Sequence, residues 1–167
     1  GKVRHFGVSN QNPMMMELLK TAVKQPLKVN QLQLSAAFTP SFEAGFHVNM
    51  EGPKAAVRDG SVFEYCRLTD TVIQAWSVLQ HGYFKGNFVG KEEFAALNHV
   101  LNDLAKKYQV TPTAIALAWV LRYPGKMQAV IGTTKPQHVL EAGKAATVTL
   151  TRKEWYQIYL AAGNDLP

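Results

Sequence analysis

The sequence predicts an α/β fold of the (β/α)8 TIM-barrel type, reduced to a half barrel of four parallel βα units plus extra helices. Two observations support this. Four short apolar runs alternate with helix-like segments, which is typical of βα units and a parallel sheet. Each run ends in polar residues, as barrel strands do at the end that binds ligands. A complete barrel needs about 250 residues, and this chain has 167. We therefore expect a single domain, residues 1–167, that forms half of such a barrel.

The four expected strands are rich in β-branched residues. They are Val3–Val8, Leu27–Leu34, Val72–Trp76 and Met127–Ile131. Three of the helices that follow begin at a proline, namely Pro13, Pro112 and Pro136. Proline is favoured at the first helical position because its missing N–H would have no partner there.

Apolar residues at helical spacing predict which helix faces are buried. Expected faces are Met14-Leu18-Leu19-Ala22-Val23, Phe94-Leu97-Val100-Leu101-Leu104 and Trp155-Ile158-Tyr159-Ala162. Thr151 with Glu154 predicts a capping box at the start of the last helix. Gly163-Asn164 predicts its end.

One long segment, Ser35–Thr71, contains no expected strand. It carries Phe38, Pro40, Phe42, Phe46 and Met50, followed by an expected helix from about Lys54 to Leu68. Loops of this length are usually functional or disordered. The aromatic side chains therefore either form the wall of a substrate pocket or pack against the top of the barrel.

Composition excludes several classes of protein. The single cysteine, Cys66, rules out an internal disulfide and a cysteine-built metal site, and its apolar surroundings predict a buried, inert thiol. No signal peptide and no run long enough to span a membrane is present, which predicts a cytoplasmic protein without membrane partners. The net charge is +6, but the basic residues are scattered. We interpret this as an ordinary surface that attracts a phosphate-bearing cofactor.

The strand ends carry the candidate site. The first ends in Ser9-Asn10, which suit a carboxamide, and the second contains the amides Asn30-Gln31. The third ends in Trp76-Ser77, a ring plane beside a hydroxyl. After the fourth, Gly132-Thr133-Thr134 leads into a helix start with Lys135, which predicts a phosphate site. Each group also has an alternative role. Ser9 and Asn10 could cap the helix after the first strand, Trp76 could belong to the core, and Gly132-Thr133-Thr134 could be a turn with a helix cap.

Five motifs in this order resemble the C-terminal half of the aldo-keto reductases, strands five to eight of their barrel. They are GVSN (Gly7–Asn10), VNQ (Val29–Gln31), QAWSVL (Gln74–Leu79), LAKKYQVTPTAIALAWVL (Leu104–Leu121) and VIGTTKPQHV (Val130–Val139). The resemblance implies an oxidoreductase that reduces aldehydes or ketones with NADP, or with NAD. In this family Ser9, Asn10 and Gln31 would hold the nicotinamide carboxamide, and Trp76 would stack on the ring. Ser77 and Leu79 would line the pyrophosphate. The adenosine end and its 2′-phosphate would meet Gly132, Thr133, Thr134, Gln137 and His138.

The sequence departs from the family at two cofactor positions. His138 stands where many relatives carry arginine, and Ala142 stands where an adenine-contacting asparagine is frequent. Histidine offers a 2′-phosphate less charge than arginine does, which bears on the preference for NADP over NAD, although Lys135 can compensate.

The larger departure is that this sequence contains none of the motifs that carry the family's catalytic tyrosine, lysine, aspartate and histidine. In the family these residues lie on strands that precede GVSN. We therefore name no catalytic residue and no metal ligand, and expect a truncated, cleaved or split reductase that is inactive alone.

Two other functions compete with this one. The unpaired edges of a half barrel recruit partners, so the chain could join a missing N-terminal half, or dimerise as a non-catalytic protein that binds nucleotide. The segment Leu101–Arg122 also imitates helix-turn-helix spacing, but Thr113–Leu121 is nearly all apolar. A DNA-reading helix needs polar side chains, so we expect no nucleic-acid partner.

Overall fold

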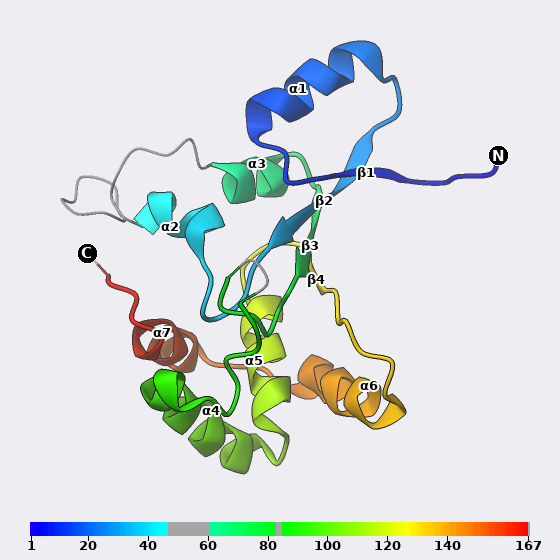
Figure 1. Cartoon of the computed structure of the whole chain (residues 1–167). Coiled ribbons are helices and arrows are strands. Elements are labelled where there is room, and N and C mark those ends of the chain that lie inside the picture. Colours follow the sequence, from blue (N-terminus) through cyan, green and yellow to red (C-terminus); the bar gives the residue numbers. More distant parts are fainter. Residues whose placement is uncertain (47–60, 83–84, 167) are drawn as a thin grey trace.

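The computed structural model describes residues 1–46, 61–82 and 85–166, and its four strands form one parallel sheet (Figure 1). The strands are β1 (Phe6–Ser9), β2 (Leu27–Gln33), β3 (Val72–Trp76) and β4 (Met127–Ala129), and they are neighbours in the order of the sequence. Every adjacent pair is parallel. Parallel neighbours need a crossover connection, and helices supply it here. The predicted α/β fold of four βα units is confirmed.

Seven α-helices and two short 3₁₀ helices complete the described chain. They are α1 (Pro13–Ala22), α2 (Pro40–Phe46), α3 (Val62–Leu68), η1 (Glu92–Phe94), α4 (Ala95–Tyr108), α5 (Pro112–Leu121), α6 (Pro136–Gly143), η2 (Lys144–Thr147) and α7 (Arg152–Ala161). In Figure 1 the strands lie in the middle of the molecule, with α1 and α3 on one side and α4 to α7 on the other.

Most predicted helix boundaries are confirmed by their caps. The Asn12 side chain accepts from Met15 N at the start of α1, and Thr111 does the same for α5. Thr151 and Glu154 form the predicted capping box of α7, which ends just before Gly163 at φ +82. These contacts satisfy backbone donors that a helix start leaves without partners.

The two edge strands are shorter than the sequence predicts. β1 begins at Phe6 rather than Val3, and β4 ends at Ala129 rather than Ile131. In the described chain each has a strand neighbour on one side only, so its end residues lack half of the ladder that would keep them extended. One hydrogen bond of the ladder continues past the end of β4: Val130 N donates to Ala75 O of β3 at 2.8 Å.

The prediction that the apolar face of α1 is buried is wrong. Met16 is its one buried residue, whereas Met14 and Leu18 are 70% and 71% exposed. The helical spacing is real, but this stripe faces away from the core of the chain. The corresponding prediction for α4 is confirmed, since Leu97, Val100, Leu101 and Leu104 are buried.

The long segment after β2 contains a helix that the sequence reading missed, α2. Its Phe42 is buried and packs against Phe63 and Tyr123, with ring centroids 5.4 and 5.5 Å apart. Phe42 therefore belongs to the core, and the packing alternative holds for it. Of the helix expected from Lys54, the structure confirms α3. Residues 47–60, including Met50, and the side chain of Phe46 lie outside the described part.

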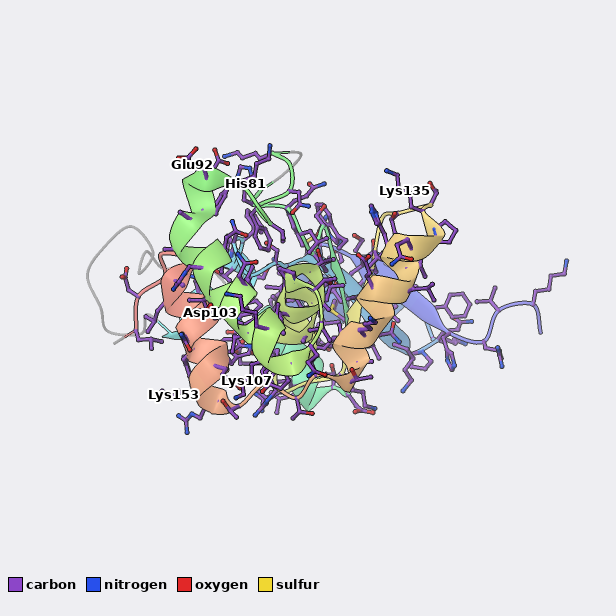
Figure 2. The ribbon with its side chains drawn as sticks, turned by 90° about the horizontal axis from the view of Figure 1, so that it is seen from below. His81, Glu92, Asp103, Lys107, Lys135 and Lys153 are labelled. Atoms are coloured by element: carbon purple, nitrogen blue, oxygen red, sulfur yellow. The ribbon has the colours of Figure 1, made fainter. Side chains whose placement is uncertain are left out.

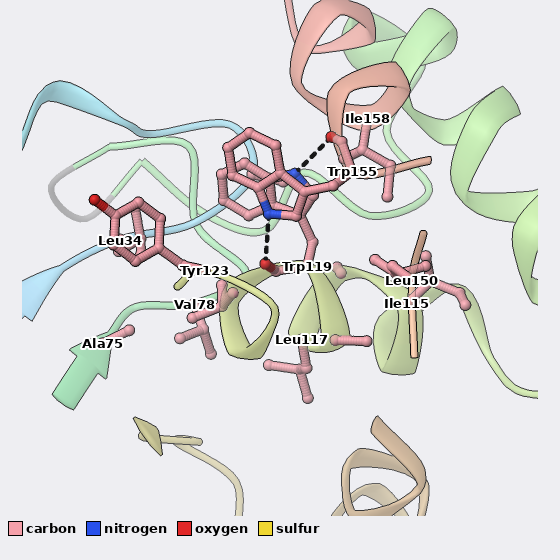
Figure 3. Close-up of a cluster of buried hydrophobic side chains, with 14 of the residues drawn as sticks. Leu34, Ala75, Val78, Ile115, Leu117, Trp119, Tyr123, Leu150, Trp155 and Ile158 are labelled. Carbon is pink, nitrogen blue, oxygen red and sulfur yellow. Dashed lines mark hydrogen bonds between the residues drawn. The ribbon is translucent and has the colours of Figure 1, made fainter. Parts of the chain in front are cut away.

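Two tryptophans join α5 to α7 at the centre of the core (Figure 3). The Trp119 and Trp155 rings stack at 4.8 Å, and each indole N–H donates to the other residue's carbonyl at 3.0 Å. Every residue of α5 from Ala114 to Val120 is buried. This helix is packed inside the protein, so the argument for a DNA-reading helix fails.

Cys66 lies in the same core and is fully buried. Burial raises the pKa of its thiol to about 11, so the predicted inert thiol is confirmed as a neutral, buried group. Across the described residues, no helix is long and apolar enough to cross a membrane. In that same part of the chain, no three His, Cys, Asp or Glu side chains gather as metal ligands.

Candidate functional site at the carboxyl ends of the strands

The residues that directly follow two of the strands have left-handed backbone conformations. Asn10, directly after β1, has φ +53, and Ser77, directly after β3, has φ +52. Left-handed backbone at a residue other than glycine costs about 1–2 kcal/mol. In the described chain Ser61, Asp70 and Gln109 also adopt it, away from these strand ends. The first strand end is also tied to the second. Ser9 Oγ donates to Gln31 O at 3.2 Å, and Asn10 N donates to the same oxygen at 2.9 Å.

The neighbouring amides Asn30 and Gln31 have different roles. Asn30 is fully buried, and its Nδ2 donates to Gln11 O at 2.8 Å. It therefore anchors the connection from β1 to α1. Successive strand residues point to opposite faces, so Gln31 projects from the other face, where its Nε2 donates to Gln74 Oε1 at 3.3 Å.

A cavity of about 520 Å³ opens at the carboxyl ends of β3 and β4. This size lies within the range of about 300–1,000 Å³ that is usual for small-molecule sites. Six of the residues predicted from the sequence line it: Trp76, Ser77, Leu79, Gly132, Thr133 and His138. Nine residues that were not predicted as site residues also line it, among them Asn87, Thr113, Leu117 and Glu141. The apolar spacing of α5 pointed only to its packing and gave no sign of this second role.

The amino-terminal end of α6 borders this cavity and suits an anion. Its first residue is Pro136, preceded by Lys135, and no side chain caps it. Thr133 Oγ1 instead accepts from Lys135 N at 3.2 Å and lies 3.4 Å from His138 Nδ1. Free N–H groups and the helix dipole at such an end attract phosphate. Figure 2 shows Lys135 at this end of the helix.

The other five predicted residues do not line the cavity. Ser9, Asn10 and Gln31 lie at the ends of β1 and β2. Thr134 and Gln137 are exposed beside the start of α6, where Gln137 Nε2 donates to Glu141 Oε1 at 3.0 Å. The candidate site is thus a row of residues along the carboxyl ends of the four strands, and the cavity lies at the ends of β3 and β4.

A buried asparagine that the sequence reading passed over holds the loop beside the cavity. Asn98 of α4 accepts from Gly90 N at 2.8 Å. Its Nδ2 donates to Phe88 O and Lys91 O, both at 3.0 Å, and to Phe94 O at 3.1 Å. An amide within an otherwise apolar helix face was the available signal, because buried polar groups need partners.

Charged residues at the opposite ends of the helices stabilise the fold. Glu154 accepts from Lys107 Nζ at 2.6 Å, from Tyr108 OH at 2.8 Å and from Thr151 N at 2.7 Å. Burial by itself would raise the pKa of Glu154, but these hydrogen bonds outweigh it and lower the pKa to about 2. Figure 2 shows Lys107 far from Lys135. In βα barrels the end opposite the ligand serves stability.

The described tyrosines lie away from the cavity. Lys20 Nζ donates to Tyr65 OH at 2.5 Å, but this pair joins α1 to α3 and does not lie at a strand end. Tyr123 and Tyr159 are buried, and burial raises the pKa of Tyr123 to about 12. None of the tyrosines in residues 1–46, 61–82 and 85–166 lines the cavity. Tyr83 lies outside those ranges.

Comparison with known proteins gives a consistent result. The model of the aldo/keto reductase family matches residues 1–161. The chain is 33% identical over 168 residues to a 6-dehydroglucose reductase from Agrobacterium fabrum, covering 99% of this chain and 49% of that protein. It is 31% identical to the Escherichia coli oxidoreductase YdhF, covering 100% of this chain and 50% of that protein. The chain therefore spans about half the length of these curated relatives.

Solved structures share the fold. An aldo-keto reductase from Klebsiella pneumoniae in complex with NADPH superposes with a TM-score of 0.67 at 20% identity, covering 95% of this chain and 48% of that one. A thermostable aldo-keto reductase bound to the inhibitor epalrestat gives 0.66 at 21% identity, with the same coverage of both chains.

Proposed function

Because the chain belongs to the aldo/keto reductase family, we propose that it is the cofactor-binding half of an NADP(H)-dependent reductase of aldehydes and ketones. One observation carries this proposal. The cavity at the ends of β3 and β4 combines a ring plane, a strained hydroxyl residue and an uncapped helix start, at Trp76, Ser77 and α6. These groups suit a stacking base, a pyrophosphate and a terminal phosphate, respectively.

The predicted residues take complementary parts in cofactor binding. Trp76 stacks on the nicotinamide, and Ser77 and Leu79 face the pyrophosphate. The carboxamide is held by Ser9, Asn10 and Gln31. Residues 132–134, with Gln137 and His138, receive the adenosine end. When bound, the cofactor supplies a hydride to the substrate carbonyl.

The preference for NADP over NAD depends on the charge beside α6. His138 and Lys135 are the nearby basic side chains, and Glu141 of the cavity wall accepts from Gln137. We expect His138→Arg to strengthen NADPH binding several-fold with little change for NADH, because a guanidinium holds a 2′-phosphate through two parallel hydrogen bonds. Titrating both cofactors into both proteins measures the change. Equal strengthening of both cofactors would place His138 away from the 2′-phosphate.

The proposed substrates are small carbonyl compounds. Proton donation to the carbonyl needs an acid poised near neutral pH, and the tyrosines described here lie outside the cavity. We therefore expect no turnover by this chain alone. NADPH oxidation with an aldehyde panel and with 6-dehydroglucose, chosen for the Agrobacterium fabrum relative, tests this. Turnover by this polypeptide alone would contradict it.

Binding of NADPH tests the proposal itself. Trp76→Ala removes the stacking plane and is expected to weaken binding by up to about tenfold, because stacking contacts are worth about 0.5–1.5 kcal/mol. Lys153→Ala, an exposed residue at the opposite end, is the matched control and keeps wild-type affinity. The proposal is wrong if the wild-type chain binds neither NADPH nor 2′,5′-ADP.

A second candidate function is a non-catalytic half barrel that pairs with another half. It is favoured by the exposed apolar side chains along both sheet edges. Near β1 these are Val3, Phe6, Met14 and Leu18, and near β4 they are Val130, Val139 and Leu140. Light scattering tests this candidate: a dimer indicates pairing with a second copy, and a strictly monomeric species at moderate concentration counts against it.

A further inference from the structure

A row of glutamine side chains crosses the sheet on one face. Gln31, Gln74 and Gln128 are register partners on β2, β3 and β4. Gln31 Nε2 donates to Gln74 Oε1 at 3.3 Å, and Gln74 Nε2 donates to Gln128 Oε1 at 2.9 Å. Branched apolar residues usually fill this layer of a βα barrel. An amide row at this place therefore calls for a function of its own.

The hydrogen bonds all run in one direction along the row. Gln31 and Gln74 use their NH2 groups as donors toward β4, and Gln74 and Gln128 use their oxygens as acceptors from the β2 side. Reversing one amide would set two donors or two acceptors against each other. In this arrangement the bond to Gln74 orients the amide of Gln31, and the bond to Gln128 orients the amide of Gln74.

The orientation of Gln31 leaves its Oε1 available. No donor of the described chain is recorded on this atom, while Nε2 is engaged by Gln74. Ser9 is the register partner of Gln31 on the other side, so this oxygen lies among the groups proposed to hold the carboxamide. An oxygen there can accept from an NH2 group and cannot donate to a carbonyl.

We infer that Gln74 is a positioning residue, which makes Gln31 an acceptor for the amino group of the nicotinamide carboxamide. This inference rests on the proposed function, because it assumes that the nicotinamide binds beside Gln31. Gln74 itself does not touch the cofactor in this account. It selects carboxamide cofactors by holding its neighbour, and Gln128 supports it from the exposed edge strand.

Three ligands separate positioning from mere folding. NADPH carries the carboxamide, its 3-acetylpyridine analogue has a methyl group in place of the NH2, and 2′,5′-ADP has no nicotinamide. We expect the wild-type chain to bind NADPH about tenfold more tightly than the analogue, the size of one well-placed hydrogen bond. Gln74→Leu should reduce this ratio to below twofold and leave the affinity for 2′,5′-ADP unchanged.

Two further variants control the result. Gln74→Glu keeps an acceptor facing Gln31 and should restore the tenfold ratio, whereas a purely structural role predicts no such rescue. Gln25→Leu, at an exposed glutamine before β2, should behave as wild type. If Gln74→Leu does not fold, Gln128→Leu removes the support at the exposed end and should lower the ratio in the same direction.

The outcomes are distinguishable. Equal loss of affinity for all three ligands in Gln74→Leu, or an unchanged tenfold ratio in that variant, overturns the inference and leaves the proposed function standing. A wild-type chain that binds 2′,5′-ADP but does not distinguish NADPH from its analogue also overturns the inference and leaves the proposed function standing. Failure of the wild-type chain to bind either NADPH or 2′,5′-ADP overturns both.

Discussion

Trp119 and Trp155 combine ring stacking with two reciprocal hydrogen bonds. Replacing Trp119 by phenylalanine leaves a cavity and removes the indole N–H that donates to the buried Trp155 carbonyl. We expect a loss of about 2–4 kcal/mol in the free energy of unfolding, measured by denaturant titration. Leu140→Ala, at a side chain that is 68% exposed, should change it by less than about 0.5 kcal/mol. Equal effects would refute this account of the core.

Glu154 links stability to pH. Its pKa is about 2 in the folded protein against an ordinary value of 4.5. A lowered folded-state pKa means that the stabilisation is complete above about pH 4.5 and is lost as the pH falls toward 2. Glu154→Gln should therefore be less stable at pH 7, by about 2 kcal/mol, and show a flatter acid limb. Glu17→Gln, at an exposed carboxylate, serves as the control. An identical acid limb in Glu154→Gln would mean that Glu154 contributes nothing.

Single-residue roles were predictable where the local pattern determines them. The Thr151–Glu154 capping box and the buried Cys66 needed only sequence neighbours. The stacked tryptophans, the Asn98 contacts and the glutamine row join residues far apart in the chain, and no local spacing encodes those distances. The resemblance to the reductases supplied the candidate cofactor residues, and their roles remain predictions to be tested.

At the scale of elements, Gly7 allows β1 to approach β2 closely. A Cβ atom there would lie 2.8 Å from Val29 Cβ and 3.0 Å from Val29 O. Gly7→Ala should therefore destabilise the protein by about 1–3 kcal/mol and speed hydrogen exchange in β1. Gly143→Ala meets open space at the end of α6 and should be neutral or stabilising. Slow exchange in β1 of Gly7→Ala would show that the strands can move apart without cost.

Element type was easier to predict than element surroundings. The strands and capped helices were found because alternation, proline and cap residues act locally. The face of α1 was predicted wrongly, because spacing shows that a stripe is apolar but not which partner covers it. Helix α2 was missed for a related reason: its Phe42 is buried by α3, α5 and α7 residues, which are distant in sequence.

At the scale of the whole molecule, four adjacent parallel βα units make an open sheet whose edges, β1 and β4, are far apart in the order of strands. Exposed apolar residues near both edges, such as Met14 and Leu140, suit burial against another half barrel. Replacing Met14 and Leu18 together by glutamate should lower the apparent mass in light scattering if two copies pair there. An unchanged dimer would place the contact elsewhere.

The central claim, that the strand ends hold a nicotinamide dinucleotide, is tested most directly by mapping amide chemical shifts of the 15N-labelled chain during titration with NADPH. The account predicts saturable shifts at Ser77, Leu79, Thr133 and His138, and none around Lys107 and Glu154 at the other end. Shifts confined to the Lys107–Glu154 end, or no shifts at saturating NADPH, would contradict it.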